Sequence, residues 1–223
     1  MSVRRRTALV SAALLLGACT ESSAPSRPVP YESRLFVSYD DNGTPAIDSL
    51  RFHWPASAMP VSYWVEDSLN APGHVRDAIA TWKGAFLYQE WDARVVSDSN
   101  SADVIVRVMQ APPKPGPALL RFFSLRPECE GVTDIDTVAT RRELRLPLRI
   151  YLNPRLPDDP GLGLCMGLTA VHEMGHTMGL FQHTTNSTDI MFTDPVATEL
   201  SDRDISTIEA LYHRESDMVP VRP

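Results

Sequence analysis

The run from His172 to His183 constrains the fold of this chain more than any other feature. It reads HEMGHTMGLFQH, and the surrounding stretch is rich in Leu, Met, Ala and Val and contains no proline, which predicts a helix. Positions i and i+4 of a helix lie about 40° apart, so His172 and His176 present both imidazoles to one metal. Neutral imidazoles suit zinc, and Glu173 lies close enough to act on a water at such a site without being a ligand.

The residues after this pair predict how a third ligand is supplied. The chain must stop the helix and fold back over the same metal, and Gly179 permits the positive φ that such a reversal needs. His183 follows four residues later. The spacing therefore predicts His172, His176 and His183 as the ligand set.

The run resembles the signature of the metzincin metallopeptidases, HExxHxxGxxH followed by a methionine-containing turn. It departs from that signature at one point, because Gln182 stands at the third-histidine position and His183 comes one residue later. Either the loop after the glycine carries an extra residue, or the site is altered and weak in metal. We expect His183 to be the ligand, since a loop absorbs an insertion readily and glutamine binds zinc poorly.

Downstream residues resemble the matrixin branch of the metzincins. The stretch Asp189–Phe192 is similar to the methionine turn, which implies that Met191 lies beneath the metal. Residues 200–212 resemble the terminal matrixin helix, with Ser201 as its cap. The resemblance implies a metzincin-like α+β domain, in which a mixed, mostly parallel twisted sheet has an antiparallel edge strand and is joined by an active-site helix and a C-terminal helix.

Hydrophobic periodicity places the other elements. An apolar face from Val75 to Phe86 predicts a helix that ends near Tyr88. Alternating runs predict strands at Val61–Val65, Ala93–Ser97, Val104–Val108, Leu119–Ser124, Val132–Val138 and Leu148–Leu152. We expect Val132–Val138 to be the antiparallel edge strand, with Leu119–Ser124 as the competing candidate.

The family resemblance implies a zinc-dependent endopeptidase in which Glu173 assists the attack of a zinc-bound water on a peptide bond. The polypeptide substrate would bind extended along the exposed sheet edge, and Phe192–Pro195 would wall the pocket just after the cleaved bond. Two alternatives stay open at this point. One is a non-catalytic zinc-binding lipoprotein on the same scaffold, and the other is a hydrolase of cell-wall peptides.

The N-terminal residues read as an export signal. A charged start at Arg4–Arg6 precedes a short apolar run over Thr7–Ala18, and Leu16–Cys19 resembles a bacterial lipobox. The resemblance implies removal of residues 1–18, lipidation of Cys19 and, with Thr20 next to it, a place in an outer membrane. The Ser/Pro-rich residues 19–33 predict a flexible tether, followed by the catalytic domain at 34–223. An ordinary secretory signal is the alternative.

Lipidation of Cys19 leaves Cys129 and Cys165 in an oxidising compartment, where they can form one disulfide. Two buried free thiols are the alternative. The turn at Pro157–Gly161 has two carboxylates that could take part in a structural calcium site, but without spaced partners a plain turn is expected.

Length and charge limit the partners. The chain has 223 residues, enough for one domain, and its formal net charge of -7 becomes -10 without residues 1–18. An acidic surface repels polyanions, so we expect no nucleic-acid partner. We also expect a monomer.

Overall fold

The computed structural model describes residues 28–39, 44–116 and 119–222. The helices are α1 (Ala71–Lys83), α2 (Leu162–Met178) and α3 (Asp202–Tyr212). The strands are β1 (Leu35–Tyr39), β2 (Pro45–Leu50), β3 (Val61–Val65), β4 (Ala93–Val96), β5 (Val104–Arg107), β6 (Leu119–Leu125), β7 (Cys129–Val138), β8 (Glu143–Pro154) and β9 (Val219–Val221). The predicted signal segment and Cys19 lie outside the described residues.

Seven strands form the main sheet, in the order β4-β3-β5-β8-β7-β6, with β9 pairing to β8. The pairs β3/β4, β3/β5, β5/β8 and β8/β9 are parallel, whereas β7 is antiparallel to both of its neighbours. The α+β fold class with a mixed, mostly parallel sheet is thus confirmed. Strands β1 and β2 form a separate antiparallel hairpin that the sequence did not predict.

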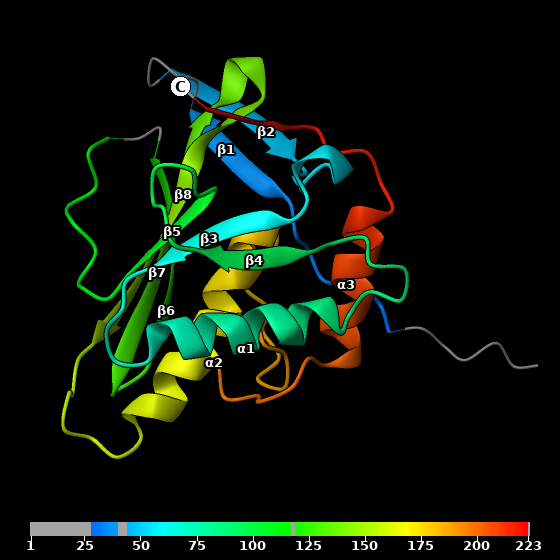
Figure 1. Ribbon diagram of the computed structural model, residues 1–223. Coiled ribbons are helices and arrows are strands. Elements are labelled where there is room, and N and C mark those ends of the chain that lie inside the picture. The colour runs from blue at the N-terminus through cyan, green and yellow to red at the C-terminus, as the bar shows by residue number, and fades with distance from the viewer. Residues whose placement is uncertain (1–27, 40–43, 117–118, 223) are drawn as a thin grey trace, which may run out of the picture.

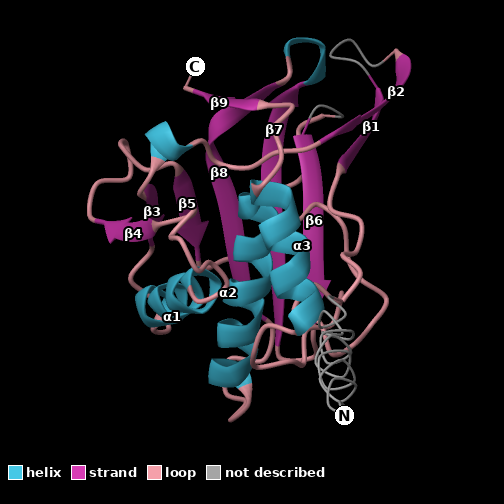
Figure 2. Cartoon of the chain, turned by 90° about the vertical axis from the view of Figure 1, so that its right-hand side faces the viewer, coloured by secondary structure: helices cyan, strands magenta, loops and turns pink. Residues whose placement is uncertain are grey.

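The prediction of the edge strand was wrong. Residues Val132–Val138 lie in β7, which is covered on its outer side by β6, so the antiparallel edge strand is Leu119–Leu125. Figure 2 shows β6 beside β7, as the last strand of the main sheet on that side. The polar residue Asp134 of β7 forms an ion pair with Arg121 of β6. The competing candidate was therefore the correct one.

The three helices lie on one side of the sheet (Figure 2). Helix α2 packs against β6, β7 and β8, and α1 packs against α2 and the β3/β4 end (Figure 1). Helix α1 ends at Lys83, five residues before the predicted end, although Phe86 beyond it remains buried. Of the residues that the structure describes, none form a helix long and apolar enough to cross a membrane.

Helix α3 begins as predicted at its Ser201 cap. Ser201 and Asp204 form a capping box, in which each side chain bonds to the other's backbone N–H. The N-terminal segment packs against this helix, since the backbone N–H of Tyr31 donates to Thr207 Oγ1. Contacts with the folded body therefore begin before residue 34, inside the stretch predicted as a tether.

Candidate metal centre

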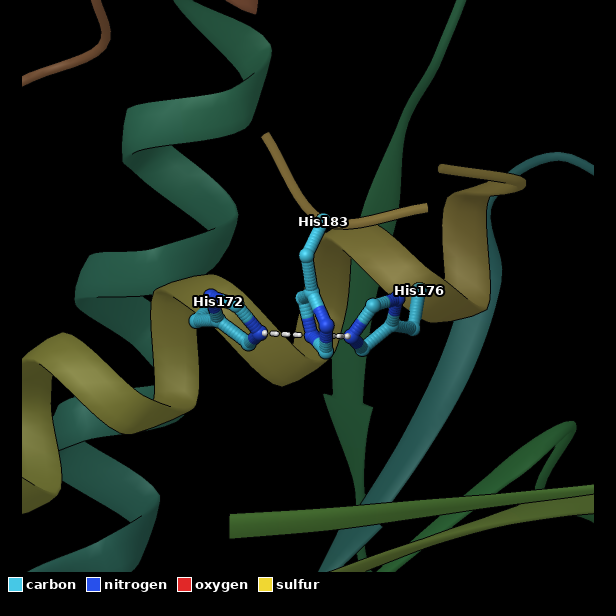
Figure 3. A group of neighbouring side chains, drawn as sticks. All are labelled: His172, His176 and His183. Atoms are coloured by element: carbon cyan, nitrogen blue, oxygen red, sulfur yellow. Dashed lines mark hydrogen bonds between the residues drawn. The ribbon is translucent and has the colours of Figure 1, made fainter. Parts of the chain in front are cut away.

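Three histidine side chains converge on one point. His172 and His176 lie one turn apart on α2, and their Nε2 atoms lie 3.1 Å and 3.2 Å from Nε2 of His183 (Figure 3). Their candidate ligand atoms lie within 4.8 Å of one another, and they form the single such His/Cys/Asp/Glu group among the described residues. His172 and His176 are fully buried, while His183 is partly exposed.

Backbone carbonyls set the tautomers of the first two histidines. Nδ1 of His172 lies 2.8 Å from the oxygen of Ile190, and Nδ1 of His176 lies 2.6 Å from the oxygen of Leu180. A carbonyl oxygen can only accept, so each Nδ1–H is the donor and each Nε2 keeps its lone pair. Burial lowers the pKa of both imidazoles, that of His172 to about 3, so both are neutral. Neutral nitrogen donors in this arrangement fit zinc.

The chain reversal after α2 brings in the third histidine. Gly179 ends the helix with φ of 109°, and a Cβ there would collide with the carbonyl oxygen of Phe52. Nε2 of Gln182 donates to the carbonyl oxygen of Arg34, 3.0 Å away. The structure thus brings His183, and not Gln182, to the other two histidines, and the extra residue is absorbed in the loop.

Glu173 lies beside the histidines but outside their group. Its Oε1 accepts from the backbone N–H and Oγ of Ser124 at 3.2 Å and 2.8 Å, and its Oε2 accepts from Thr133 Oγ1 at 2.6 Å. Burial raises the pKa of Glu173 to about 7, while these hydrogen bonds act in the opposite direction. A carboxyl group with such a pKa can both take and give a proton near neutral pH.

The turn at Asp189–Phe192 packs under the active-site helix. Met191 is fully buried, and its Sδ lies so close to Gly175 that a Cβ there would come within 2.5 Å. The turn is fixed by Asp204 of α3, which accepts from the backbone N–H of Ile190 at 2.9 Å. Asp189 in turn accepts from Thr184 Oγ1 and from Ser201 Oγ.

The comparison with protein families agrees with this geometry. The model of the Matrixin family, Peptidase_M10, matches residues 137–213, which hold β8, α2, the methionine turn and α3. This part of the chain is similar to the matrixin branch of the metzincins, and the three histidines fit that resemblance. A search of curated proteins found no match. The family match and the three histidines support a zinc metallopeptidase.

A disulfide supports the first turn of helix α2, which carries the histidines. Cys129, at the start of β7, is bonded to Cys165, in the first turn of α2, with their Cα atoms 6.0 Å apart. The predicted disulfide is confirmed, and free thiols at these positions were the wrong alternative. At Pro157–Gly161 the chain makes a turn in which the carboxylate of Asp159 accepts from the backbone N–H of Gly161.

Three residues that contact the centre were not predicted. Ser124 and Thr133 bind Glu173, and the ring of Phe122 stacks on His176 with centroids 4.9 Å apart. All three lie at least 40 positions from their partners in the sequence. These residues lie in segments without a recognisable motif, so nothing in the sequence near them indicates that they reach the site. Their role becomes visible only when the packing of β6 and β7 against α2 is known.

Proposed function

We propose that this zinc metallopeptidase is an endopeptidase that cuts internal bonds of extended polypeptides. The observation that carries the proposal is the convergence of three neutral imidazoles, with Nε2 separations of 3.1 Å and 3.2 Å, next to a buried carboxyl group that is not among them. We assign the metal to His172, His176 and His183. When bound, zinc polarises a carbonyl and lowers the pKa of a water toward about 7.

In the proposed mechanism Glu173 moves the proton. Its carboxylate takes a proton from the attacking water as the bond to the peptide carbon forms. The same group then gives that proton to the leaving amine as the peptide C–N bond breaks. The substrate would bind as an added strand beside the sheet, with Phe192–Pro195 against its other side.

The test compares the wild type with Glu173→Gln at equal zinc content, using an unfolded protein as substrate and mass spectrometry to locate the cuts. We expect internal, chelator-sensitive cuts by the wild type and a loss of at least about 100-fold in the variant. Equal cleavage by both proteins would overturn the role of Glu173. Bound zinc without cleavage of any polypeptide would favour a non-catalytic zinc-binding lipoprotein. Cleavage of cell-wall peptides alone would change the substrate class.

We also propose that the protein is exported and anchored by a lipid on Cys19 in a bacterial outer membrane, with the folded body acting as a monomer that binds no nucleic acid. The lipobox-like Leu16–Cys19 and the charged, short apolar segment before it support this proposal. We expect the wild type in the membrane fraction and Cys19→Ser in the soluble exported fraction. The same fraction for both proteins would overturn the anchor.

A further inference from the structure

Strand β6 lies directly on the metal centre. The ring of Phe122 stacks on His176 and, with centroids 5.8 Å apart, on Phe181. Two residues later, the backbone N–H and the hydroxyl of Ser124 both donate to Glu173. One short strand therefore contacts both a proposed metal ligand and the proposed base.

The backbone of β6 is held on both sides. On one side it pairs antiparallel with β7, from Leu119 opposite Asp136 to Leu125 opposite Glu130. On the other side the N–H of Leu125 donates to the carbonyl oxygen of Thr193, 3.2 Å away. A peptide that binds by strand addition is held by backbone hydrogen bonds of the same kind. Strand β6 thus lies where the proposed function puts the extended substrate, between the outer side of β7 and the Phe192–Pro195 segment.

This placement covers the site on the side of α2. His172, Glu173 and His176 have no exposed surface. Both carboxylate oxygens of Glu173 already accept hydrogen bonds from the protein, Oε1 from Ser124 and Oε2 from Thr133. A water and a substrate carbonyl need space beside Glu173 and the histidines, where Ser124 and Phe122 now lie. These two side chains must therefore move before the proposed reaction can begin.

We propose that β6 is an internal competitor of the substrate, which keeps the peptidase latent until the strand leaves the outer side of β7. This inference rests on the proposed function and adds its regulation. The chain stays covalently continuous when β6 leaves, because residues 126–128 connect it to β7. A polypeptide that pairs with β7 would compete with β6 for the same hydrogen bonds.

One side-chain contact that holds β6 on β7 lies away from the histidines. Arg121 donates from Nε and Nη2 to the two oxygens of Asp134 on β7, both at 2.7 Å, and the carboxylate is almost fully buried. Such two-point pairs are among the stronger hydrogen-bonded contacts in proteins. Arg121 also donates to the carbonyl oxygen of Pro112 and so holds the preceding loop. Removing this pair weakens the attachment of β6 to β7 without changing a metal ligand or Glu173.

The test uses two variants, each with a matched control. Arg121→Ala removes the cation, and Asp134→Asn removes the charge without leaving a buried carboxylate unpaired. The controls are Arg145→Ala and Asp136→Asn, which break an ion pair between β7 and β8 whose side chains do not contact β6; at 3.5 Å and partly exposed, this pair is weaker than Arg121–Asp134. Zinc content and thermal unfolding establish that each protein is folded and loaded.

Three measurements are made on each full chain: hydrogen exchange of residues 119–125, the rate at which a chelator removes zinc, and the kinetics of cleavage of an unfolded protein. In the Arg121 and Asp134 variants we expect faster exchange, zinc loss about tenfold faster, and a KM about tenfold lower with kcat little changed. Saturating substrate displaces an internal competitor, so such a competitor raises KM and leaves kcat unchanged, and weakening it lowers KM alone. The controls should match the wild type.

The outcomes separate this inference from the proposed function. Faster exchange and faster zinc loss with unchanged kcat/KM would overturn latency and leave the peptidase in place. Unchanged exchange of 119–125 in both variants would show that β6 is a fixed part of the site and overturn the inference. Faster exchange and zinc loss without cleavage by any zinc-loaded protein would overturn the proposed function, while β6 would remain a cover on the metal centre.

Discussion

The side-chain nitrogen of Gln182 donates to the backbone oxygen of Arg34, 3.0 Å away, while its neighbour His183 turns to the two histidines of α2. These two consecutive side chains thus point to different partners. Gln182 connects the loop to the N-terminal segment. The backbone N–H of Phe181 makes a second such connection by donating to the carbonyl oxygen of Ser33. These bonds fix the loop in which His183 approaches the metal centre.

This relationship predicts that alanine substitutions at 182 and 183 differ sharply. His183→Ala removes one of three donors and should lower zinc affinity by at least about 100-fold, since a two-ligand zinc site is incomplete. Gln182→Ala removes one neutral, exposed hydrogen bond and should cost about 1 kcal/mol of stability or less, with zinc near one per chain. Elemental analysis after dialysis against a weak chelator measures both. Zinc retained by His183→Ala, or lost by Gln182→Ala, would overturn the ligand assignment.

Gly131 offers a test of Glu173 that leaves the carboxyl group in place. A Cβ at Gly131 of β7 would collide with Cγ2 of Thr169 and would lie 2.5 Å from Oε1 of Glu173, so Gly131→Ala must push both side chains aside. We expect the cleavage rate to fall at least about 100-fold, which is the smallest effect typical of losing a general base. Zinc should be retained. Cleavage rate and zinc content are measured together.

The control for this substitution is Gly163→Ala on α2, where a new Cβ meets nothing within 4 Å. In the middle of a helix alanine is favoured over glycine by roughly 0.5–1 kcal/mol. Because Gly163 lies in the first turn of α2, this variant should be as active as the wild type and at least as stable. Full activity of Gly131→Ala would count against a role for Glu173 in its present position.

The disulfide predicts a specific stability loss. Cys129 and Cys165 are 36 residues apart, and closing a loop of that length in the unfolded chain is worth about 3–4 kcal/mol. The Cys129→Ser/Cys165→Ser double variant should lose about that much free energy of unfolding in a urea titration. The wild type titrated under strong reductant serves as the comparison and should approach the variant. A loss below about 1 kcal/mol would show that the crosslink constrains little beyond the existing sheet pairing.

The parts of the fold and site that the sequence predicted are those encoded locally. Helix α2, its end at Gly179 and the three histidines follow from spacing within one short run. The identity of the edge strand depends on pairing between segments, and the sequence pattern of Val132–Val138 does not reveal that Arg121 neutralises Asp134 from β6. For the same reason Ser124, 49 positions from Glu173, could not be recognised. Contacts made by tertiary pairing leave no periodicity in either segment.

The contact between Tyr31 and Asp204 predicts a pH dependence of stability. The Tyr31 hydroxyl donates to Asp204 at 2.8 Å, and burial, followed by the charge of Asp204, raises its pKa well above 10. A group whose pKa is raised by folding stabilises the fold fully below its unfolded pKa, here near 10, and this stabilisation is lost as the pH rises above that value.

Tyr31→Phe should cost about 1 kcal/mol at pH 8. Above pH 10 its free energy of unfolding should fall less steeply with pH than that of the wild type, by up to about 1.4 kcal/mol per pH unit. Denaturant titrations between pH 8 and 11.5 measure both effects, with the exposed Tyr88→Phe as the control, which should follow the wild type. Parallel stability curves for Tyr31→Phe and the wild type above pH 10 would mean that the Tyr31 hydroxyl ionises equally well in the folded protein, and so that the N-terminal segment is not docked on α3.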